Sequence, residues 1–155
     1  MIMKQLLDTN ILLIYNRNRA LSQAIEQDYQ IFAPEKVQHI SFVSIGEIWS
    51  IFHQIGVGDR RRNDMERRLG ELTEMDINFD SVLDYYEEID AYSQGRHRTL
   101  KSDFTAINMG KNDLWIAATA AAFDLTLVTT DGDFDHLDGV FLKLIRIPLK
   151  KYQSS

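Results

Sequence analysis

The sequence predicts a single α/β domain in which a central, mostly parallel sheet is flanked by helices. Strand-like and helical segments alternate along its 155 residues, and strands joined by helices in this way form parallel sheets with right-handed crossovers. The segment 110–135 shows the unit most clearly, because an apolar helix, a short apolar strand and two acidic clusters follow one another there. No repeat, linker or low-complexity segment divides the chain, so we expect one domain over residues 1–155.

The first half of the chain holds two predicted strands, Lys4–Leu7 and Gln38–Val43, the second of which is alternating and β-branched. Helical spacing is found in four segments, at 11–16, 21–29, 44–55 and 59–75. Gly56-Val57-Gly58 ends the third of these helices, and the fourth is highly charged. We expect the third and fourth to form a helical hairpin.

The second half begins with a short predicted strand at Ile77–Phe79 and a helix at Ser81–Ser93. The polar segment Gly95–Gly110 has no clear period and predicts a loop with at most one helical turn. The remaining elements are a helix at 112–123, strands at 125–128 and 141–147, and a tail from 148 onward. The helix 112–123 is apolar nearly all round, which indicates that it is buried on most faces.

Composition excludes several classes of protein. The chain has no cysteine, so it forms neither disulfides nor thiolate metal sites. No apolar run approaches the ~20 residues that span a bilayer, and the N-terminus lacks the layout of a signal peptide, which fits a cytoplasmic protein without a membrane partner. The net charge of −6 means that any contact with nucleic acid must use a local basic patch.

Four acids stand where a predicted strand ends or a predicted helix begins: Asp8, Glu47, Asp113 and Asp131. In an open α/β sheet these positions lie at one edge, where active sites are found. Carboxylates that meet in a small volume repel one another, and a divalent cation relieves the repulsion. Ligation by oxygen alone favours Mg²⁺ or Mn²⁺ over Zn²⁺.

Each acid also has a purely structural explanation. Asp8 fits a helix N-cap, although a charge that ends the buried strand Leu6-Leu7 is costly without a partner. Ser44 and Glu47 have the spacing of a capping box. The helix dipole favours Asp113 at a helix start, and Asp131-Gly132-Asp133 is ordinary turn chemistry.

Other site chemistries find no support in the sequence. The phosphate-loop pattern GxxxxGK[ST] and the serine-elbow pattern GxSxG are both absent. The four histidines show no ligand spacing, so we interpret them as structural or surface residues; they are His39, His53, His97 and His136. A phosphotransfer or receiver-like protein also has acids at strand ends, but a dehalogenase-like site needs an acid where Asn10 stands.

Four stretches of the chain resemble the PIN-domain nucleases, and especially VapC-like toxins. They are Leu6-Leu-Asp-Thr-Asn-Ile-Leu, Ser44-Ile-Gly-Glu-Ile, Asn112-Asp-Leu-Trp-Ile-Ala-Ala-Thr-Ala and Leu127-Val-Thr-Thr-Asp-Gly-Asp-Phe. The resemblance covers nearly the whole chain and implies a PIN-like fold and a Mg²⁺- or Mn²⁺-dependent endoribonuclease. Its catalytic and metal-binding quartet would be Asp8, Glu47, Asp113 and Asp131, with Asp133 as a fifth ligand and Asn10 and Thr129 in support.

Basic residues outside the acidic pocket would have to hold the RNA. We expect Lys111, next to Asn112-Asp113, together with Arg96 and Arg98 of the polar segment, to bind the substrate. That segment is longer and more polar than the family pattern suggests. Further candidates are Lys101 and the arginines of the charged helix, although such a run is commonly just a solvated helix face; these are Arg60, Arg61, Arg62, Arg67 and Arg68.

Two partners are expected beside the RNA. The VapC-like resemblance implies a small antitoxin protein that covers the acidic crevice. The apolar and aromatic content of Val43–Ile55 and Ser81–Tyr92 is high for so small a domain and, with the resemblance, predicts a homodimer. The alternative functions are a PIN-domain nuclease of RNA processing or repair outside any toxin-antitoxin pair, a phosphotransfer or receiver-like α/β protein, and a non-catalytic PIN-like interaction module. The last would need a broken quartet.

Overall fold

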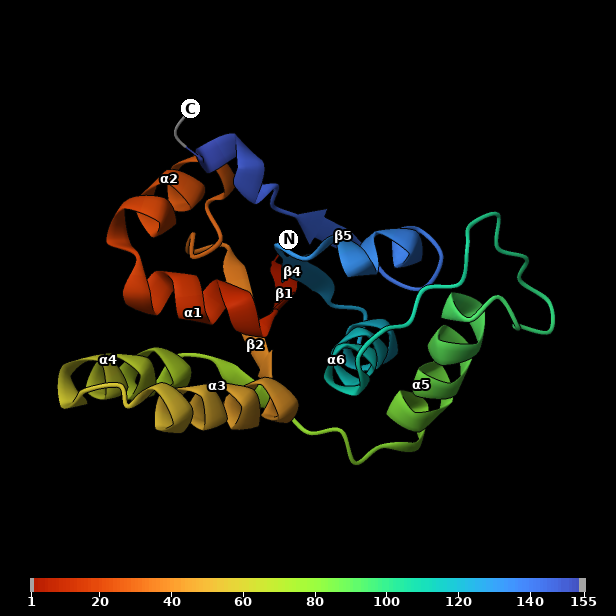
Figure 1. Ribbon diagram of the computed structural model, residues 1–155, viewed down its shortest axis with the longest axis horizontal. Helices are drawn as coiled ribbons and strands as arrows, with labels where there is room; N and C mark the ends of the chain where they lie inside the picture. Colours follow the sequence, from red (N-terminus) through yellow and green to blue (C-terminus); the bar gives the residue numbers. More distant parts are fainter. Residues whose placement is uncertain (1, 154–155) are drawn as a thin grey trace.

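A five-stranded sheet forms the centre of the molecule in the computed structural model, which describes residues 2–153. The strands are β1 (Met3–Leu7), β2 (Lys36–Ser41), β3 (Thr73–Met75), β4 (Thr126–Thr129) and β5 (Leu144–Arg146). Their order is β3-β2-β1-β4-β5, and all four pairings are parallel, which confirms the predicted fold class (Figure 1).

Helices cover both faces of the sheet. They are α1 (Thr9–Arg17), α2 (Arg19–Tyr29), α3 (Phe42–Ile55), α4 (Asp59–Gly70), α5 (Asp80–Ser93) and α6 (Lys111–Ala122), with 3₁₀ helices η1 (Gly132–Leu137) and η2 (Leu149–Tyr152). Figure 1 shows α1 to α4 on one side of the sheet and α5, α6 and η1 on the other. None of the helices in residues 2–153 is long and apolar enough to cross a membrane.

Two hydrophobic cores lie on the two faces of the sheet, and alternating strand residues divide between them. Leu7 and Val128 pack with α1 to α4, whereas their neighbours Leu6 and Leu127 pack with α5, α6 and η1. This is the period of two that a strand covered on both faces requires. The expected burial of the apolar helix is also confirmed, since most of α6 between Leu114 and Ala120 is inaccessible to solvent.

The strand predicted at Ile77–Phe79 is wrong. The edge strand is instead Thr73–Met75, and the charged helix, predicted to reach Met75, ends at Gly70. An edge strand pairs with one neighbour only, here β2, and keeps exposed residues such as Thr73 and Glu74, so it needs no continuous apolar run. The hairpin of the third and fourth helices forms as expected, with Arg61 of α4 lying over the Phe52 ring of α3.

The predicted capping box at Ser44 is also wrong. β2 ends at Ser41, whose side chain accepts a hydrogen bond from the Val43 amide at 3.1 Å and caps α3. The helix therefore begins at Phe42, two residues before the predicted start at Ser44, and Val43, which was predicted to end the strand, is helical. Ser44 is buried inside the first turn, and Glu47 lies more than a turn into the helix.

The chain beyond Pro148 is not a free tail over the described residues. Leu149 and Tyr152 of η2 pack against the core on the face covered by α1 to α4, and the Tyr152 hydroxyl donates to Asp28 at 2.6 Å. The last strand is shorter than predicted and spans Leu144–Arg146. The segment 95–110 is a loop, as expected, and contains no helical turn.

Candidate metal centre

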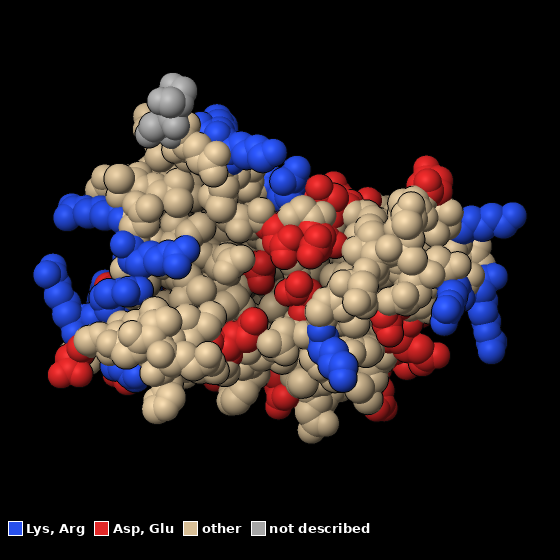
Figure 2. All heavy atoms as spheres, in the orientation of Figure 1, with Lys and Arg blue, Asp and Glu red and all other residues tan. Residues whose placement is uncertain are grey.

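The strand order places a crevice between β1 and β4. β1 connects through α1 and α2 to β2 on one side, whereas β4 on its other side is reached much later in the chain. At such a reversal the loops that leave the two strands diverge, and ligands bind outside the carboxyl ends of the strands. Asp8 directly follows β1, and Asp131 lies two residues after β4. Figure 2 shows acidic side chains gathered in the middle of this face of the molecule.

Asp8 is only 4% exposed, and its carboxylate is held from two sides. One oxygen accepts from the Thr9 amide at 2.8 Å, which makes Asp8 the N-cap of α1, and the other accepts from the Thr129 hydroxyl at 2.6 Å. Burial raises the pKa of Asp8, the two hydrogen bonds oppose that rise, and the charges of Glu47 and Asp131 add to it. The carboxylate of Asp8, at the end of a buried strand, therefore has two hydrogen-bond partners, the Thr9 amide and the Thr129 hydroxyl.

Asp113, Asp131 and Asp133 bring carboxylate oxygens within 4.8 Å of one another. Asp113 comes from the first turn of α6, whereas Asp131 is the N-cap of η1 and Asp133 lies in the first turn of η1. Asp131 accepts from the Asp133 amide at 2.9 Å and caps η1, and its own amide donates to Thr129 Oγ1 at 3.0 Å. The turn chemistry predicted for Asp131-Gly132-Asp133 thus coexists with a cluster of acids.

The pKa of Asp113 is raised to about 7, first by burial and then by the negative charges of Asp8, Asp131, Glu47 and Asp133. Four separate acids therefore act on one carboxyl group, although they are up to 125 positions apart in the sequence. A carboxyl group in this position is stabilised by either a proton or a cation.

Glu47 belongs to the same crevice but not to the three-carboxylate cluster. Its Oε1 accepts from the Thr9 hydroxyl at 2.7 Å, and Thr9 also contacts Ser44 Oγ at 2.9 Å. Glu47 and Asp113 line one open pocket of about 340 Å³. Thr9 was not singled out from the sequence, yet it is 5% exposed and links the acids of two elements. Its position directly after Asp8 is the sequence feature that could have indicated a place for Thr9 in the site.

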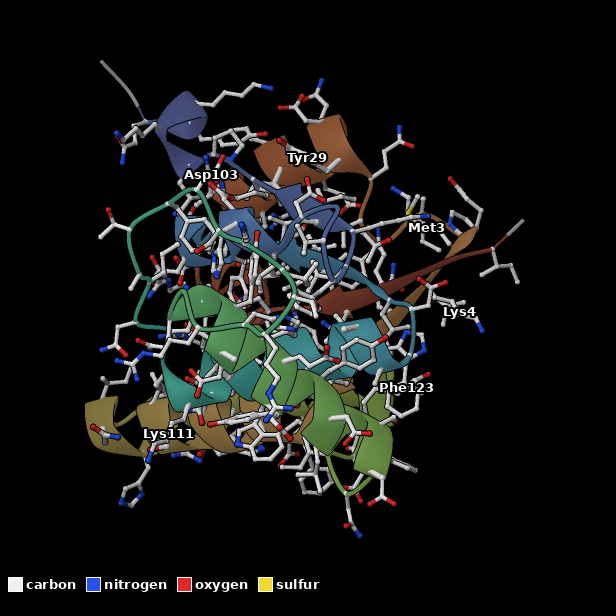
Figure 3. All side chains as sticks on the ribbon, turned by 90° about the vertical axis from the view of Figure 1, so that its right-hand side faces the viewer. Met3, Lys4, Tyr29, Asp103, Lys111 and Phe123 are labelled. Carbon is white, nitrogen blue, oxygen red and sulfur yellow. The ribbon has the colours of Figure 1, made fainter. Side chains whose placement is uncertain are left out.

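The predicted supporting and substrate-binding residues fall in different places. Thr129 is fully buried against Asp8, whereas Asn10 is exposed on α1, outside this hydrogen-bond network, and its role stays a prediction. Lys111 lines the pocket that Glu47 and Asp113 share. Figure 3 shows Lys111 on the side of the molecule opposite Met3, Lys4 and Phe123, which mark the amino ends of β1 and β4.

Arg96 and Arg98 are exposed in the loop 95–110 and do not line that pocket. The second half of the loop packs against the end of α5, since the Ile107 amide donates to the Ser93 carbonyl and Phe104 packs edge-on against Tyr92. Their part in substrate binding stays a prediction.

The histidines have structural surroundings or lie on the surface, as expected. His39 is buried and its Nδ1 lies 3.0 Å from the Gln5 carbonyl, and His53 is exposed. His97 contacts Glu88 at 3.2 Å. His136 contacts Ser93 Oγ at 2.7 Å and stacks on Tyr92, and burial lowers its pKa.

The family model of the PIN domain matches residues 6–140, which is most of the chain and includes every acid described above. The chain belongs to the PIN domain family. No curated protein sequence matches it significantly.

Solved structures with the same fold include several toxin-antitoxin complexes. VapBC2 from Rickettsia felis, bound to a DNA fragment from its promoter, has a TM-score of 0.72 at 21% identity, over 93% of this chain and 98% of that chain. VapBC-5 from Mycobacterium tuberculosis has a TM-score of 0.58 at 23% identity, over 93% and 98%. DNA-bound VapBC from Salmonella typhimurium has a TM-score of 0.62 at 16% identity, over 94% and 98%. At these identities the similarity shows that the PIN fold is shared.

The strand order of this PIN domain also separates it from receiver-like proteins, which the sequence left open. Those proteins have the order 2-1-3-4-5, with the third strand beside the first. Here β4 takes that place, and β3 lies at the edge beside β2. The receiver-like alternative is therefore excluded by topology.

The acids of this PIN domain suit a hard divalent cation. A Mg²⁺–oxygen bond is about 2.1 Å long, so the oxygens that one ion would hold can lie no more than about 4.2 Å apart. The oxygens of Asp113, Asp131 and Asp133 lie within 4.8 Å of one another, so a small side-chain movement brings them to ligand distance. The donor set is carboxylate alone, which fits Mg²⁺ or Mn²⁺.

Proposed function

We propose that this PIN domain is a Mg²⁺- or Mn²⁺-dependent endoribonuclease that hydrolyses phosphodiester bonds in RNA, and that it is the toxin of a toxin-antitoxin pair. The observation that carries the proposal is the convergence of Asp113, Asp131 and Asp133 in front of Asp8 and Glu47, with the pKa of Asp113 raised to about 7. A carboxyl group whose pKa is raised by burial and by neighbouring charges, and which lies in a crevice, is typical of a functional site.

In this proposal Asp113, Asp131 and Asp133 hold the ion or ions directly, and Asp8 and Glu47 complete the acidic set. A bound Mg²⁺ or Mn²⁺ supplies an activated water and stabilises charge on the scissile phosphate. The chain's own part is to fix the carboxylates. Thr129 orients Asp8 and the turn that carries Asp131, and Thr9 orients Glu47.

RNA would approach from the side on which Lys111 lies. This side chain sits at the pocket that Glu47 and Asp113 line, so its charge can bind a phosphate next to the scissile one. Arg96 and Arg98 would hold the strand from the loop 95–110. With divalent ions held by these acids, the local charge would be reversed and the crevice would no longer repel the RNA backbone.

Two protein partners belong to the proposal. The relatives VapBC2 and VapBC-5 carry the names of toxin-antitoxin systems, and this supports a small antitoxin whose basic residue reaches the carboxylates. Exposed apolar residues support a homodimer, since Phe42, Phe79 and Leu83 are 58%, 47% and 51% exposed on or next to α3 and α5. We place the protein in the cytoplasm, where RNA targets are.

The test combines growth with purified protein. Expression of the wild-type chain in a bacterial host should slow growth, and Asp8→Asn should relieve the effect. Purified wild type should cleave single-stranded RNA with Mg²⁺ or Mn²⁺ and stop when chelator is added. Cleavage that persists in chelator overturns the metal-dependent mechanism. RNA cleavage by a chain that is harmless in several hosts would favour the alternative, a PIN-domain nuclease of RNA processing or repair.

A further inference from the structure

A basic groove lies between α1, α2 and α4, away from the acidic crevice. It has a volume of about 450 Å³ and is lined by five arginines and one carboxylate, namely Arg17, Arg19, Arg60, Arg61, Arg68 and Asp64. The arginines come from two parts of the sequence about forty positions apart. Only the α4 members belong to the run that the sequence suggested as a solvated helix face.

The groove is built by specific contacts between α1 and α4. Asn16 donates to the Arg61 carbonyl at 3.0 Å and to Asp64 Oδ2 at 2.9 Å, and it accepts from Arg61 Nε at 3.1 Å. Asn18 ends α1 and caps α2, which sets Arg17 and Arg19 on either side of one sharp turn. The relative positions of the arginines are therefore fixed by the fold.

Most of the positive charge in this groove is not neutralised. Asp64 is the one carboxylate lining it, and Asp64 is already bound by Arg67 at 2.7 Å and by Arg68 at 2.9 Å. Arg17, Arg19 and Arg60 are exposed and form no ion pair with any residue in 2–153. These three guanidinium groups give the groove a positive potential that attracts anions, although the net charge of the protein is −6.

Helix α1 connects the groove to the acidic crevice. Asp8 caps its N-terminus, and Arg17 is its last residue. Nine helical residues at 1.5 Å each separate the two ends by about 13 Å. Figure 2 shows Lys and Arg side chains gathered over α1, α2 and α4 on the same face as the central acids. A polyanion that runs along α1 would therefore meet both.

We propose that this groove binds the phosphate backbone of the RNA strand whose scissile phosphate lies in the acidic crevice, an inference that rests on the proposed function. Guanidinium groups bind phosphate oxygens bidentately, which suits three free arginines to a repeating phosphate chain. Tyr15 lines the groove but is buried, and its hydroxyl donates to Glu26 at 2.8 Å, so it offers no face for base stacking. The groove binds RNA through its backbone and positions the strand without selecting its sequence.

The experiment measures binding of a fluorescein-labelled 12-nucleotide oligouridylate by anisotropy, in chelator so that no cleavage occurs. Arg17→Gln/Arg19→Gln should raise Kd at least fivefold and reduce the slope of log K against log salt by about 1.4, because each lost phosphate contact on a single strand is worth about 0.7. Adding Arg60→Gln should bring the total reduction to about 2.

The matched control is Lys4→Gln/Lys143→Gln, which removes two exposed charges that line a pocket at the other end of β1 and β4. Its Kd should stay within twofold of wild type, and both doubles should keep the wild-type melting temperature. A polyglutamate peptide of equal charge should compete poorly with the RNA. Equal loss of binding in both doubles, no loss in either, or full competition by polyglutamate overturns the proposal.

The result separates this inference from the proposed function. If wild type cleaves RNA with Mn²⁺ while the arginine double binds the 12-mer as wild type does, the groove proposal fails alone. If binding depends on the groove but wild type cleaves no RNA under any metal condition, the nuclease proposal fails and the groove remains an RNA-binding surface.

Discussion

The Thr129 hydroxyl donates to Asp8 Oδ2 at 2.6 Å and accepts from the Asp131 amide at 3.0 Å. One buried side chain at the end of β4 thus fixes an acid at the end of β1 and the turn that carries two more acids. This hydroxyl joins the ends of β1 and β4, whereas the caps at Asp8 and Asp131 are each local to one element.

Thr129→Val should therefore reduce both stability and activity. Valine has nearly the same shape but lacks the hydroxyl, so Asp8 keeps one hydrogen bond and stays buried, at a cost of about 1–3 kcal/mol. Urea unfolding at pH 8 should show the loss, and Thr129→Ser should recover most of it. A Val variant as stable as wild type would mean that water replaces the hydroxyl without cost.

The stability of the metal-free protein should fall as pH rises from about 4 to about 7. The pKa of Asp113 rises from 3.8 to about 7 on folding, so between these values the folded state holds a proton that the unfolded state has lost. Folding is then favoured by acid, and the advantage is lost as the pH passes the folded pKa. Urea unfolding in chelator at pH 5 and pH 8 measures this dependence.

Asp113→Asn removes that dependence, so it should be more stable than wild type at pH 8 in chelator. The matched control is Asp84→Asn, an exposed acid of α5, which should follow the wild-type curve. At pH 8, Mn²⁺ should raise the melting temperature of wild type much more than that of Asp113→Asn, since a ligand that binds only the folded state stabilises it. Equal stabilisation of both proteins would contradict the metal site.

Asp8→Asn and Asp8→Ala should differ in stability and agree in activity. Asparagine caps a helix as well as aspartate does and removes a buried charge, so the melting temperature should hold or rise. Alanine loses the cap and the Thr129 partner and should cost about 1–3 kcal/mol. Both should lower RNA cleavage by orders of magnitude. Wild-type cleavage by either variant would remove Asp8 from the site.

The protein should be a dimer in solution at micromolar concentration, and Leu83→Glu should favour the monomer. Leu83 is 51% exposed on α5, one turn after the exposed Phe79, and a charge there opposes apolar association. Light scattering of both proteins tests this. The exposed Glu87→Gln on the same helix serves as the control and should remain dimeric. A monomeric wild type contradicts the prediction.

The centre of the fold could be predicted from the sequence, whereas its edges could not. β1 and β4 contain the apolar pairs Leu6-Leu7 and Leu127-Val128, because both strands are covered on both faces there, and so Asp8 and Asp131 could be placed at their carboxyl ends. β3 is half exposed and pairs on one side only, so Thr73-Glu74-Met75 carries no such signal. The choice between Ser41 and Ser44 as helix cap depended on where β2 stopped pairing.

The links inside the site could not be predicted, because they depend on which helices pack together. The Thr9–Glu47 hydrogen bond joins residues 38 positions apart, and Asn16 meets Asp64 across 48 positions. Patterns of neighbouring residues in the sequence do not indicate contacts over such separations. The basic groove could not be predicted for the same reason, because Arg17 and Arg60 belong to α1 and α4, whose packing the sequence does not indicate.

The central position of β1 determines when the acidic cluster can form during synthesis. The segment that forms β2 is complete at residue 41, but β4 supplies the other neighbour of β1 only from residue 126, and the Thr129–Asp8 hydrogen bond spans 121 positions. Until then a nascent chain carries Asp8 and Glu47 on a half-built sheet with one edge of β1 unpaired. At about 5–20 residues per second, the 121 positions between Asp8 and Thr129 correspond to about 6–24 seconds of synthesis. A nascent chain that has not yet made β4 and η1 lacks Asp131 and Asp133, and so it has no cluster of three carboxylates.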